Sequence, residues 1–508
     1  MVYIYVVTVI GFLGIVIYYY LTKNYGYWKN TRVPYLKDTL PGLGNVYPML
    51  LMRKSILQMY EEMYNAMPGC SMVGFYNLMD PALLIKDPEL VKSVLQTNFS
   101  SFSSNGITID SKRDRLLSGN PFMLEGGKWK AARQQLSSAF TSGKLKYMYE
   151  SINTVCDKLV TYVDDKIAKG NGEAEVELKE MYSRYTAEVV ASAAFGVEGN
   201  SFKDDGSSTF TEIGKTIFEP SYVKGLKHLS TLFVPFLAKI LNVSFLPPKI
   251  ENIFINLVRD MLKYREEHNI QRNDFLQLMI NLKKSGASDN AYGGEFSDMT
   301  TTSHAASFFL DGYETSSITL SFVCYQLAIH PEIQQRVRDE VLAAVEKYNK
   351  ITYEALNEMT YMEQVIYESL RVYPAGGVLM KVCTKEIDLE GVDGITYRVM
   401  PGTYVMISVG GLHKDPEHWP DPEKFDPERF TEENKQNRHR FTYLAFGEGP
   451  RVCVGMRMAM LQMKAAIATT VMNYTFELSP KTETPIKLDP RYFLTAAIGG
   501  LWVKLKSL

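Results

Sequence analysis

A long apolar segment with two carboxylates at its middle limits how this chain can fold. The segment runs from Met299 to about Ile329 and is apolar on most sides, so that as a helix it must be buried. Its length alone would permit a membrane span, but the bilayer interior makes charged side chains such as Asp311 and Glu314 costly. The segment therefore predicts a helix that runs through the interior of a large protein.

The ends of this helix are also marked in the sequence. Ser297 or Asp298 can cap its first turn, and the helix must close before His330-Pro331. Proline is favoured at the first position of a helix, so we expect the next helix over Pro331–Tyr348.

Helix-period patterns dominate from about residue 50 onward, and strand-like alternation is confined to short pieces. These pieces lie around Met72–Tyr76, Leu83–Lys86, Val378–Val382, Tyr404–Ile407 and Ala496–Leu505. Three polar breaks are too short to be interdomain linkers, namely Glu198–Ser208, Lys283–Asp298 and Thr431–Arg440. We therefore expect one mainly α catalytic body with a small β region, although 508 residues alone would permit about three domains.

Charge and cysteine usage exclude several classes of protein. Lysine and arginine number 55 against 57 acidic residues, so no basic excess points to nucleic acid. The cysteines are scattered and odd in number, at Cys70, Cys156, Cys324, Cys383 and Cys453. This is neither a disulfide framework nor a zinc site, and it fits a body that faces a reducing compartment.

The first residues predict a membrane anchor. Val2–Thr22 carries no charge, is long enough to span a bilayer, and is followed by Lys23, Lys29 and Arg32. The positive-inside rule then places the rest of the chain in the cytoplasm. A cleaved signal peptide is the alternative, but the apolar run is too long and lacks a basic start and an Ala-x-Ala site. We expect a transmembrane signal anchor, a basic and proline-rich strap and a catalytic domain, at residues 1–22, 23–49 and 50–508.

Cys453 lies in a glycine-punctuated loop, Phe446-Gly447-Glu448-Gly449-Pro450-Arg451-Val452-Cys453-Val454-Gly455. The loop runs into an apolar helix that is expected from Met456 to about Asn473. A thiolate that ligates iron needs backbone N–H groups and a helix N-terminus near its sulfur. Gly449 and Gly455 allow a tight turn and a close approach to the plane of a metal group, and Arg451 can reach a carboxylate on the same cofactor.

The spacing Phe-x-x-Gly-x-Arg-x-Cys-x-Gly matches the signature of the cytochrome P-450 heme-thiolate enzymes, and the chain resembles that family. Further family motifs follow in family order over almost the whole chain, and smaller stretches look most like insect microsomal members of the xenobiotic-oxidising branch. The resemblance implies a cytochrome P-450 fold that binds heme b. It also implies that Cys453 is the axial ligand of the heme iron and that Phe446, Gly447 and Gly455 lie against the heme.

The middle of the long helix resembles the family's oxygen-activation motif, Ala/Gly-Gly-x-Asp/Glu-Thr. Gly312 allows a local kink beside which a small ligand can sit, Thr315 can hydrogen-bond a distal oxygen, and Glu314 can help bring protons from water. The alternative is structural: the threonine hydroxyl bonds the carbonyl four residues earlier, and the glutamate is paired elsewhere.

Asp311 departs from this motif, because it stands where the family usually carries Ala or Gly. Helical spacing puts it on the same face as His304, Phe308 and Thr315, so it should face the iron site. Three interpretations remain open. Asp311 binds a cationic or hydroxylated substrate, or it is neutral and hydrogen-bonded within the helix. The third is an ester to a heme methyl, as in the fatty-acid-hydroxylating branch, although Asp is one methylene shorter than the Glu found there.

A second motif places Glu368 and Arg371 three residues apart on one helix face, where they can form an ion pair. With Arg429 of Pro427-Glu428-Arg429-Phe430, the pair resembles the family's buried triad near the cysteine loop. The resemblance implies that Glu368, Arg371 and Arg429 form a structural lock.

Trp129 and Arg133, one helical turn apart, resemble the family's Trp-x-x-x-Arg motif, which donates hydrogen bonds to a heme propionate. A half-buried tryptophan beside a solvated arginine is the alternative. Lys381 falls where many microsomal members have Arg or His contacting the other propionate, although lysine can make only a monodentate contact.

The resemblance implies a monooxygenase that inserts one atom of O2 into small apolar xenobiotics or endogenous lipids and hormones. The chain has no nucleotide fingerprint, so electrons from NADPH must arrive through a partner. The implied partner is the flavoprotein NADPH-cytochrome reductase, with a microsomal b-type cytochrome as a further candidate, both at the endoplasmic reticulum membrane. Basic residues that could meet an acidic partner are Lys128, Lys130, Lys144, Lys146 and Arg457, unless they form only a solvated face.

The substrate should be small and apolar. The chain between helices at Phe210–Ile250 is rich in Phe, Leu, Ile and Pro and resembles the family's mobile lid. Other expected pocket walls are Asn105–Leu124, Ala375–Val378 and Tyr492–Ala497. The candidate substrate-contacting residues are Phe308, Asp311, Ala375, Val378 and Phe493.

Two rival functions remain. A heme-thiolate isomerase or dehydratase would need neither O2 nor a reductase, but such members typically lack the helix threonine, so Thr315 counts against it. A non-catalytic heme-binding sensor is the other, and the intact acid–alcohol pair argues against it.

Overall fold

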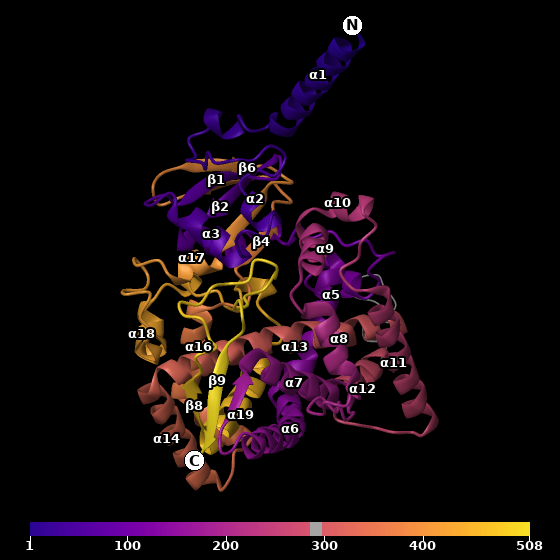
Figure 1. The fold of residues 1–508 in the computed structure, drawn as a ribbon, viewed down its shortest axis with the longest axis vertical. Coiled ribbons are helices and arrows are strands. Elements are labelled where there is room, and N and C mark those ends of the chain that lie inside the picture. Colours follow the sequence, from indigo (N-terminus) through magenta and orange to yellow (C-terminus); the bar gives the residue numbers. More distant parts are fainter. Residues whose placement is uncertain (285–296) are drawn as a thin grey trace.

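The computed structural model describes residues 1–284 and 297–508 and is mainly helical, with three small sheets (Figure 1). The family fold predicted from the sequence is mainly α with a small β region, and the observed architecture confirms that class. The N-terminal and middle helices are α1 (Val2–Thr22), α2 (Tyr47–Leu50), α3 (Ile56–Asn65), α4 (Pro88–Lys92), α5 (Gly126–Ser137), α6 (Ser142–Lys169), α7 (Leu178–Val190), α8 (Thr209–Phe218), α9 (Tyr222–Phe233), α10 (Pro235–Ile240), α11 (Pro248–Glu267) and α12 (Phe275–Lys284). The later helices are α13 (Asp298–Ile329), α14 (Pro331–Tyr348), α15 (Tyr353–Glu358), α16 (Thr360–Val372), α17 (Val409–His413), α18 (Glu432–Asn437) and α19 (Met456–Asn473).

Helix α13 is the long apolar helix that the sequence predicts, and it crosses the middle of the body (Figure 1). Ser297 caps it, with its hydroxyl oxygen accepting from the backbone N–H of Thr300 at 3.2 Å. Most of its residues are buried on all sides, as expected for a helix without a polar face. The predicted bounds of α14 and α19 are confirmed as well, because a proline opens α14 and the glycine-rich loop precedes α19.

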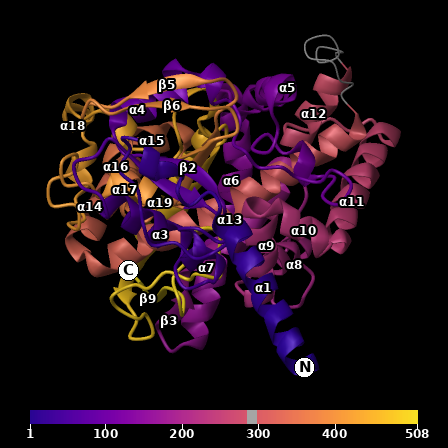
Figure 2. The same ribbon diagram turned by 90° about the horizontal axis from the view of Figure 1, so that it is seen from above.

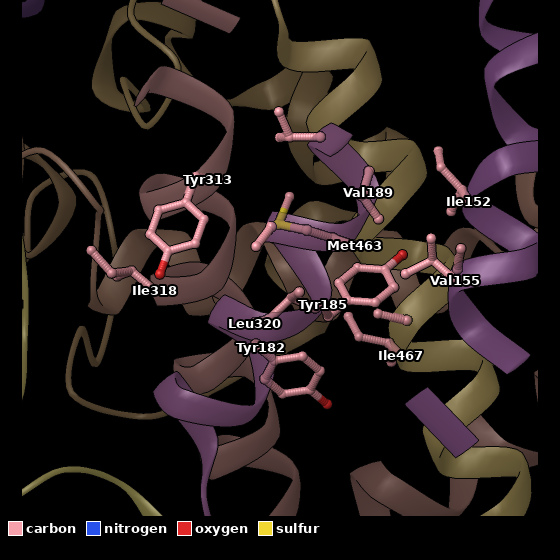
Figure 3. Packing of buried hydrophobic residues seen from close by; sticks show 14 of the residues in the cluster. Ile152, Val155, Tyr182, Tyr185, Val189, Tyr313, Ile318, Leu320, Met463 and Ile467 are labelled. Carbon is pink, nitrogen blue, oxygen red and sulfur yellow. The ribbon is translucent and has the colours of Figure 1, made fainter. Parts of the chain in front are cut away.

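The core around α13 is built by helices that are far apart in the sequence. Figure 3 shows side chains of α6, α7, α13 and α19 meeting in one cluster, where Tyr182, Tyr185, Leu320, Met463 and Ile467 are fully buried. Burying a large apolar side chain contributes about 1.5–3 kcal/mol. The Tyr185 hydroxyl donates to the Gln462 carbonyl at 2.9 Å, so its polar end is satisfied too.

The largest sheet has the strand order β1-β2-β7-β4, with β1 (Met72–Asn77), β2 (Asp80–Ile85), β7 (Tyr404–Ser408) and β4 (Val378–Val382). Strands β2 and β7 run parallel, and the outer pairs are antiparallel. A second sheet joins β3 (Ala174–Glu177), β9 (Trp502–Ser507) and β8 (Tyr474–Leu478), and β5 (Ile387–Glu390) pairs with β6 (Thr396–Val399).

Several predicted boundaries are wrong. The predicted strand Ala496–Leu505 begins only at Trp502, because Gly499 and Gly500 adopt positive φ angles of 76° and 80° and turn the chain. Lys86 lies just outside β2. The polar stretch Thr431–Arg440 is not wholly a loop, since Thr431 caps α18 by accepting from the Asn434 N–H.

The other two polar breaks and the predicted lid have separate outcomes. Glu198–Ser208 is irregular, as expected, and Ser208 caps α8. Most of Lys283–Asp298 lies outside the described residues. The chain between helices at Phe210–Ile250 is itself largely helical, because nearly all of α8 and the whole of α9 and α10 lie within it and α11 begins there.

Helix α1 projects from the body and has no buried residue (Figure 1). Figure 2, seen from above, shows α1 passing over the body and the N-terminus beyond its edge. With a mean hydropathy of 2.2, α1 is long and apolar enough to cross a membrane, although a signal sequence would satisfy the same criterion. The strap behind it is ordered, because the Trp28 indole N–H donates to the Phe75 carbonyl at 2.9 Å and Gly42 N–H donates to the Leu21 carbonyl at 3.2 Å.

Deleting residues 2–20 is expected to leave the body folded and to lower the share of the protein that floats with membranes. The physical reason is that α1 buries no side chain against the body but exposes a continuous apolar surface. Thermal unfolding and membrane flotation of the full-length and shortened chains measure the two effects. A shortened chain without a cooperative unfolding transition would contradict this prediction.

Candidate functional site

The loop before α19 has a conformation that positions Cys453 at the N-terminus of that helix. The Cys453 N–H donates to the Phe446 carbonyl at 2.9 Å, and Gly449–Arg451 form a turn of 3-10 helix. Gly449 has a φ of +74°, and a Cβ there would lie 2.0 Å from the Leu95 carbonyl oxygen. Only glycine fits that position.

The Cys453 side chain is exposed although it lies deep in the protein. Burial raises the pKa of its thiol, while the backbone N–H groups of Gly455 and Met456 and the charge of Arg133 act in the opposite direction. An exposed sulfur in a desolvated region opens onto an internal space rather than onto the outer surface. The N–H groups of the helix start favour the thiolate there.

Asp311 of α13 faces the same internal space. Like Cys453, Asp311 is exposed although it lies deep in the protein, in the middle of an otherwise buried helix. Burial raises the pKa of its carboxyl group to about 7. The charge of Asp311 also raises the pKa of the Cys453 thiol. The Asn120 amide donates to both carboxylate oxygens, at 3.3 and 3.2 Å. Helix α13 and the cysteine loop therefore form two facing walls.

The predicted acid–alcohol pair divides between two environments. The Thr315 hydroxyl donates to the Asp311 backbone carbonyl at 2.6 Å, and α13 continues as a helix through Gly312. Glu314 has no exposed side-chain surface and pairs with Lys179 Nζ at 2.7 Å, while the Tyr492 hydroxyl donates to the same carboxylate oxygen. Both contacts are those of the structural alternative. The threonine oxygen nevertheless keeps its acceptor sites, because a hydroxyl can donate and accept at once.

Three cations converge beside the cysteine loop. Arg451 lies over the Trp129 ring, with 4.5 Å from Cζ to the ring centroid, and donates to the carbonyls of Ser103, Pro121 and Leu124. Arg133 donates to the Val452 carbonyl at 2.6 Å.

Lys381 of β4 is the third cation, and its ammonium donates to Asn105 Oδ1 at 2.7 Å. Burial, with a contribution from Arg451, lowers the pKa of Lys381 to about 7, and burial lowers that of Arg451 to about 10. Within residues 1–284 and 297–508, none of Arg133, Lys381 and Arg451 forms an ion pair with a carboxylate. Buried cations without such a partner are costly, so this cluster suits an anionic group.

These features fit the heme that the resemblance implies. The thiol of Cys453 is open on one side, and the three cations can meet two propionates. A Cβ on Gly447 or Gly455 would meet no atom within 4 Å, so bare backbone borders the space beside the sulfur. The donor set is therefore a single thiolate with a cationic rim. A cluster of three or more His, Cys, Asp or Glu that could hold a bare metal ion is absent from the described residues.

The predicted lock residues are brought together. Arg371 of α16 donates to Glu368 twice, from Nε at 2.7 Å and from Nη2 at 2.8 Å, and neither side chain is exposed. Arg429 Nε lies 3.5 Å from the same carboxylate. Arg371 also donates to the backbone carbonyls of His413 and Pro422, so its guanidinium ties α16 to two later segments.

His413 connects this lock to the cysteine loop and was not identified from the sequence. Its Nε2 accepts from the Leu444 N–H at 2.8 Å, so Nδ1 carries the proton and donates to the Arg371 carbonyl at 3.1 Å. Burial and the charge of Arg371 lower its pKa to about 3, which keeps the ring neutral. No local pattern marks His413, because its partners lie 42 and 31 residues away.

The candidate substrate residues occupy different positions. Phe308 packs against Phe140 and Phe275, with ring centroids 5.9 and 4.8 Å away, so part of its ring belongs to the core. Phe493 contacts three aromatic rings of the α8–α11 region: Phe218, His228 and Phe245. Ala375 is buried and Val378 is half-buried at the start of β4.

Arg371→Ala is expected to destabilise the protein by about 3–5 kcal/mol, because it removes the bidentate partner of the buried Glu368 carboxylate and leaves only the more distant Arg429 cation. We expect heme binding to be lost together with the fold. Denaturant unfolding and absorbance of the purified variant measure the two effects. Arg398→Ala is the matched control, since Arg398 pairs with Asp388 on the surface. A fully heme-loaded Arg371→Ala protein would show that the lock is dispensable.

Comparison with known proteins agrees with this geometry. A family model described as Cytochrome P450 matches residues 34–502. Cytochrome P450 6k1 of Blattella germanica is 36% identical over 497 residues, covering 95% of this chain and 92% of that protein. Probable cytochrome P450 6a13 of Drosophila melanogaster is 35% identical over 502 residues, covering 98% and 97%. Cytochrome P450 6A1 of Musca domestica is 32% identical over 505 residues, also covering 98% and 97%. The chain therefore belongs to the cytochrome P450 family of heme-thiolate monooxygenases.

Proposed function

We propose that this protein inserts one oxygen atom into small, mostly apolar substrates, with electrons that NADPH supplies through a membrane-bound flavoprotein reductase. In the overall reaction, substrate, O2, NADPH and one proton give hydroxylated or epoxidised product, water and NADP+. The observation that carries the proposal is the position of Cys453. Its thiol opens onto an internal space whose opposite wall carries Asp311, one turn from Thr315.

The residues that would hold heme follow from the site. Cys453 would ligate the heme iron, Phe446, Gly447 and Gly455 would help to hold the heme, and the cationic cluster would bind its propionates. In that cluster Arg451 and Arg133 are fixed by backbone carbonyls, Trp129 packs on Arg451, and Lys381 is held by Asn105. Bound heme supplies the redox chemistry, which thiolate donation directs toward O–O cleavage.

Protons would reach this wall through Glu314. The carboxylate is fully buried, but its partner Lys179 is partly exposed, with 27% of its side-chain surface accessible. Lys179 therefore connects Glu314 with solvent, while the buried Tyr492 hydroxyl holds the same carboxylate oxygen. Thr315 follows Glu314 directly in the chain and turns its hydroxyl toward Asp311, so the pair can pass a proton from one side of the helix to the other.

Thr315→Ala is expected to lower product formed per NADPH by at least about tenfold, because proton delivery loses its hydroxyl. Consumed NADPH should then appear as hydrogen peroxide. Thr319→Ala is the matched control, since the Thr319 hydroxyl donates in the same way to the Thr315 carbonyl, at 2.8 Å. Product, NADPH and peroxide are measured together. Equal coupling in the two variants would contradict a special role for Thr315.

The expected reductase contacts differ in their availability. Lys146 pairs with Glu354, and Arg457 donates to Phe140 and Ser142. Lys128, Lys130 and Lys144 are exposed, and none of the ion pairs within the described residues involves them. These three lysines are the better candidates for an acidic flavoprotein surface, or for a b-type cytochrome.

The apolar N-terminal helix decides the proposed location of the protein in the cell. We place residues 1–22 in the endoplasmic reticulum membrane as an uncleaved signal anchor, residues 23–49 at its surface as the strap, and residues 50–508 in the cytoplasm as the catalytic domain. The apolar and fully exposed α1 and the basic residues behind it support this arrangement. Substrates that partition into lipid would be concentrated at this surface.

The ferrous–CO difference spectrum of membranes containing wild type or Cys453→Ser tests the proposal first. We expect a red-shifted Soret band in the wild type and its loss in the variant, because serine cannot supply a thiolate. A band at the position of histidine-ligated heme would overturn the assignment of Cys453. Substrate turnover that consumes neither NADPH nor O2 would favour the isomerase or dehydratase alternative. Absence of any turnover would favour the non-catalytic heme-binding protein.

A further inference from the structure

The two acids at the middle of α13 differ in their partners and surroundings. Glu314 is fully buried and pairs through Oε1 with Lys179 and Tyr492, while its Oε2 has no hydrogen-bond partner among the described residues. Asp311 forms no ion pair with any residue that the structure describes, and among those residues only the Asn120 side-chain amide donates to its carboxylate. An ionised carboxylate offers about four acceptor sites. Most of the acceptor capacity of Asp311 therefore remains free on the side that faces the internal space.

Asn120 is fixed in the orientation that this contact needs. The residue is 2% exposed, and its Oδ1 accepts from the Phe122 N–H at 2.7 Å. Because Oδ1 is occupied by a donor, Nδ2 must be the atom that faces Asp311. The loop that carries Asn120 is one of the expected pocket walls. The carboxylate is thus oriented in advance by a rigid neighbour, which is the arrangement expected of a recognition group.

An incompletely paired carboxylate in a desolvated space is unfavourable by itself. Burial raises its pKa to about 7, which expresses that cost. A ligand that donates a hydrogen bond would relieve the cost, and an isostere without the donor would not. A site built around a polar acceptor therefore discriminates against molecules that leave it unpaired.

We propose that Asp311, positioned by Asn120, selects substrates that carry a hydrogen-bond donor, a hydroxyl or a protonated amine, on an otherwise apolar body. The inference rests on the proposed function and names the substrate class for that site. Asp311 is the recognition residue, and Asn120 is a positioning residue that acts through it. Ligands with a carboxylate are disfavoured, since they would bring a second negative charge to Asp311.

The test is a set of binding titrations on heme-loaded protein, followed through the ligand-induced shift of the Soret band. The probes share one alkyl chain: decanol, decyl methyl ether and dimethyldecylamine. Each is titrated into wild type, Asp311→Ala, Asn120→Ala and Asp388→Asn. The last is the control, because Asp388 lies on the surface with Arg398. The measured quantity is the dissociation constant of each donor probe divided by that of decyl methyl ether in the same protein. Because all probes share one alkyl chain, this ratio cancels differences between variants in their affinity for the apolar chain.

In wild type and in Asp388→Asn, at least one donor probe should bind about tenfold more tightly than the ether. That preference should vanish in Asp311→Ala and shrink in Asn120→Ala. A preference for decanol identifies a hydroxyl as the recognised group, and a preference for dimethyldecylamine alone identifies an ammonium; either supports the proposal. Equal donor-to-ether ratios in wild type and Asp311→Ala overturn it.

Two checks separate this inference from the function on which it rests. Every variant is first examined for the CO band, and the selectivity titrations are made only on proteins that show it. A missing band in wild type counts against the proposed function, not against the selectivity of Asp311. Heme is then extracted with acidified organic solvent. Complete extraction is expected, whereas heme retained by wild type but released by Asp311→Ala would show an ester at this carboxylate and overturn a recognition role.

Discussion

The fold around the cysteine loop depends on one ion pair that water does not reach. Arg371 and Glu368 have no exposed side-chain surface, so their mutual attraction must offset the loss of hydration of both charges. The guanidinium meets this cost with five donors in a planar fork, shared between the carboxylate and the carbonyls of later segments. His413 extends the network to Leu444, two residues before the glycine-rich loop. A charge pair in α16 thereby determines where a sulfur atom lies more than eighty positions further along the chain.

Helix α13 separates two chemical environments within a few residues. On one side Glu314 is paired with a lysine that reaches solvent, and on the other Asp311 and Thr315 face the wall that carries Cys453. A helix can keep such groups apart because successive side chains point about 100° from each other. The packing of α13 against α7 and α19 makes this possible, since it leaves the two acids as carboxylates in a buried and otherwise uncharged stretch of helix.

Local signals in the sequence predicted the parts of the fold that local chemistry decides. The bounds of α13, α14 and α19 follow from a serine cap, a proline and a glycine-rich loop, and the family motifs identified the lock before its atoms could be placed. Features decided by distant partners could not be predicted in this way. Nothing near Asn120 indicates that it meets α13, and nothing near His413 indicates that it joins Arg371 to Leu444. The late start of β9 depended on backbone angles at two glycines, which residue types permit but do not require.

The strap behind α1 is held at both ends, because Gly42 bonds back to the last turn of α1 and Trp28 is sealed against β1. A strap held in this way is a rigid connection between α1 and the body rather than a flexible linker. With α1 in the membrane, as proposed, the body would keep one orientation relative to the bilayer and turn mainly about the membrane normal. A partner anchored in the same membrane would then not need to meet this protein in every possible orientation. The two proteins would need only the right rotation about the membrane normal to bring their binding surfaces together. Lateral diffusion and that one rotation would then set how often the two proteins meet productively.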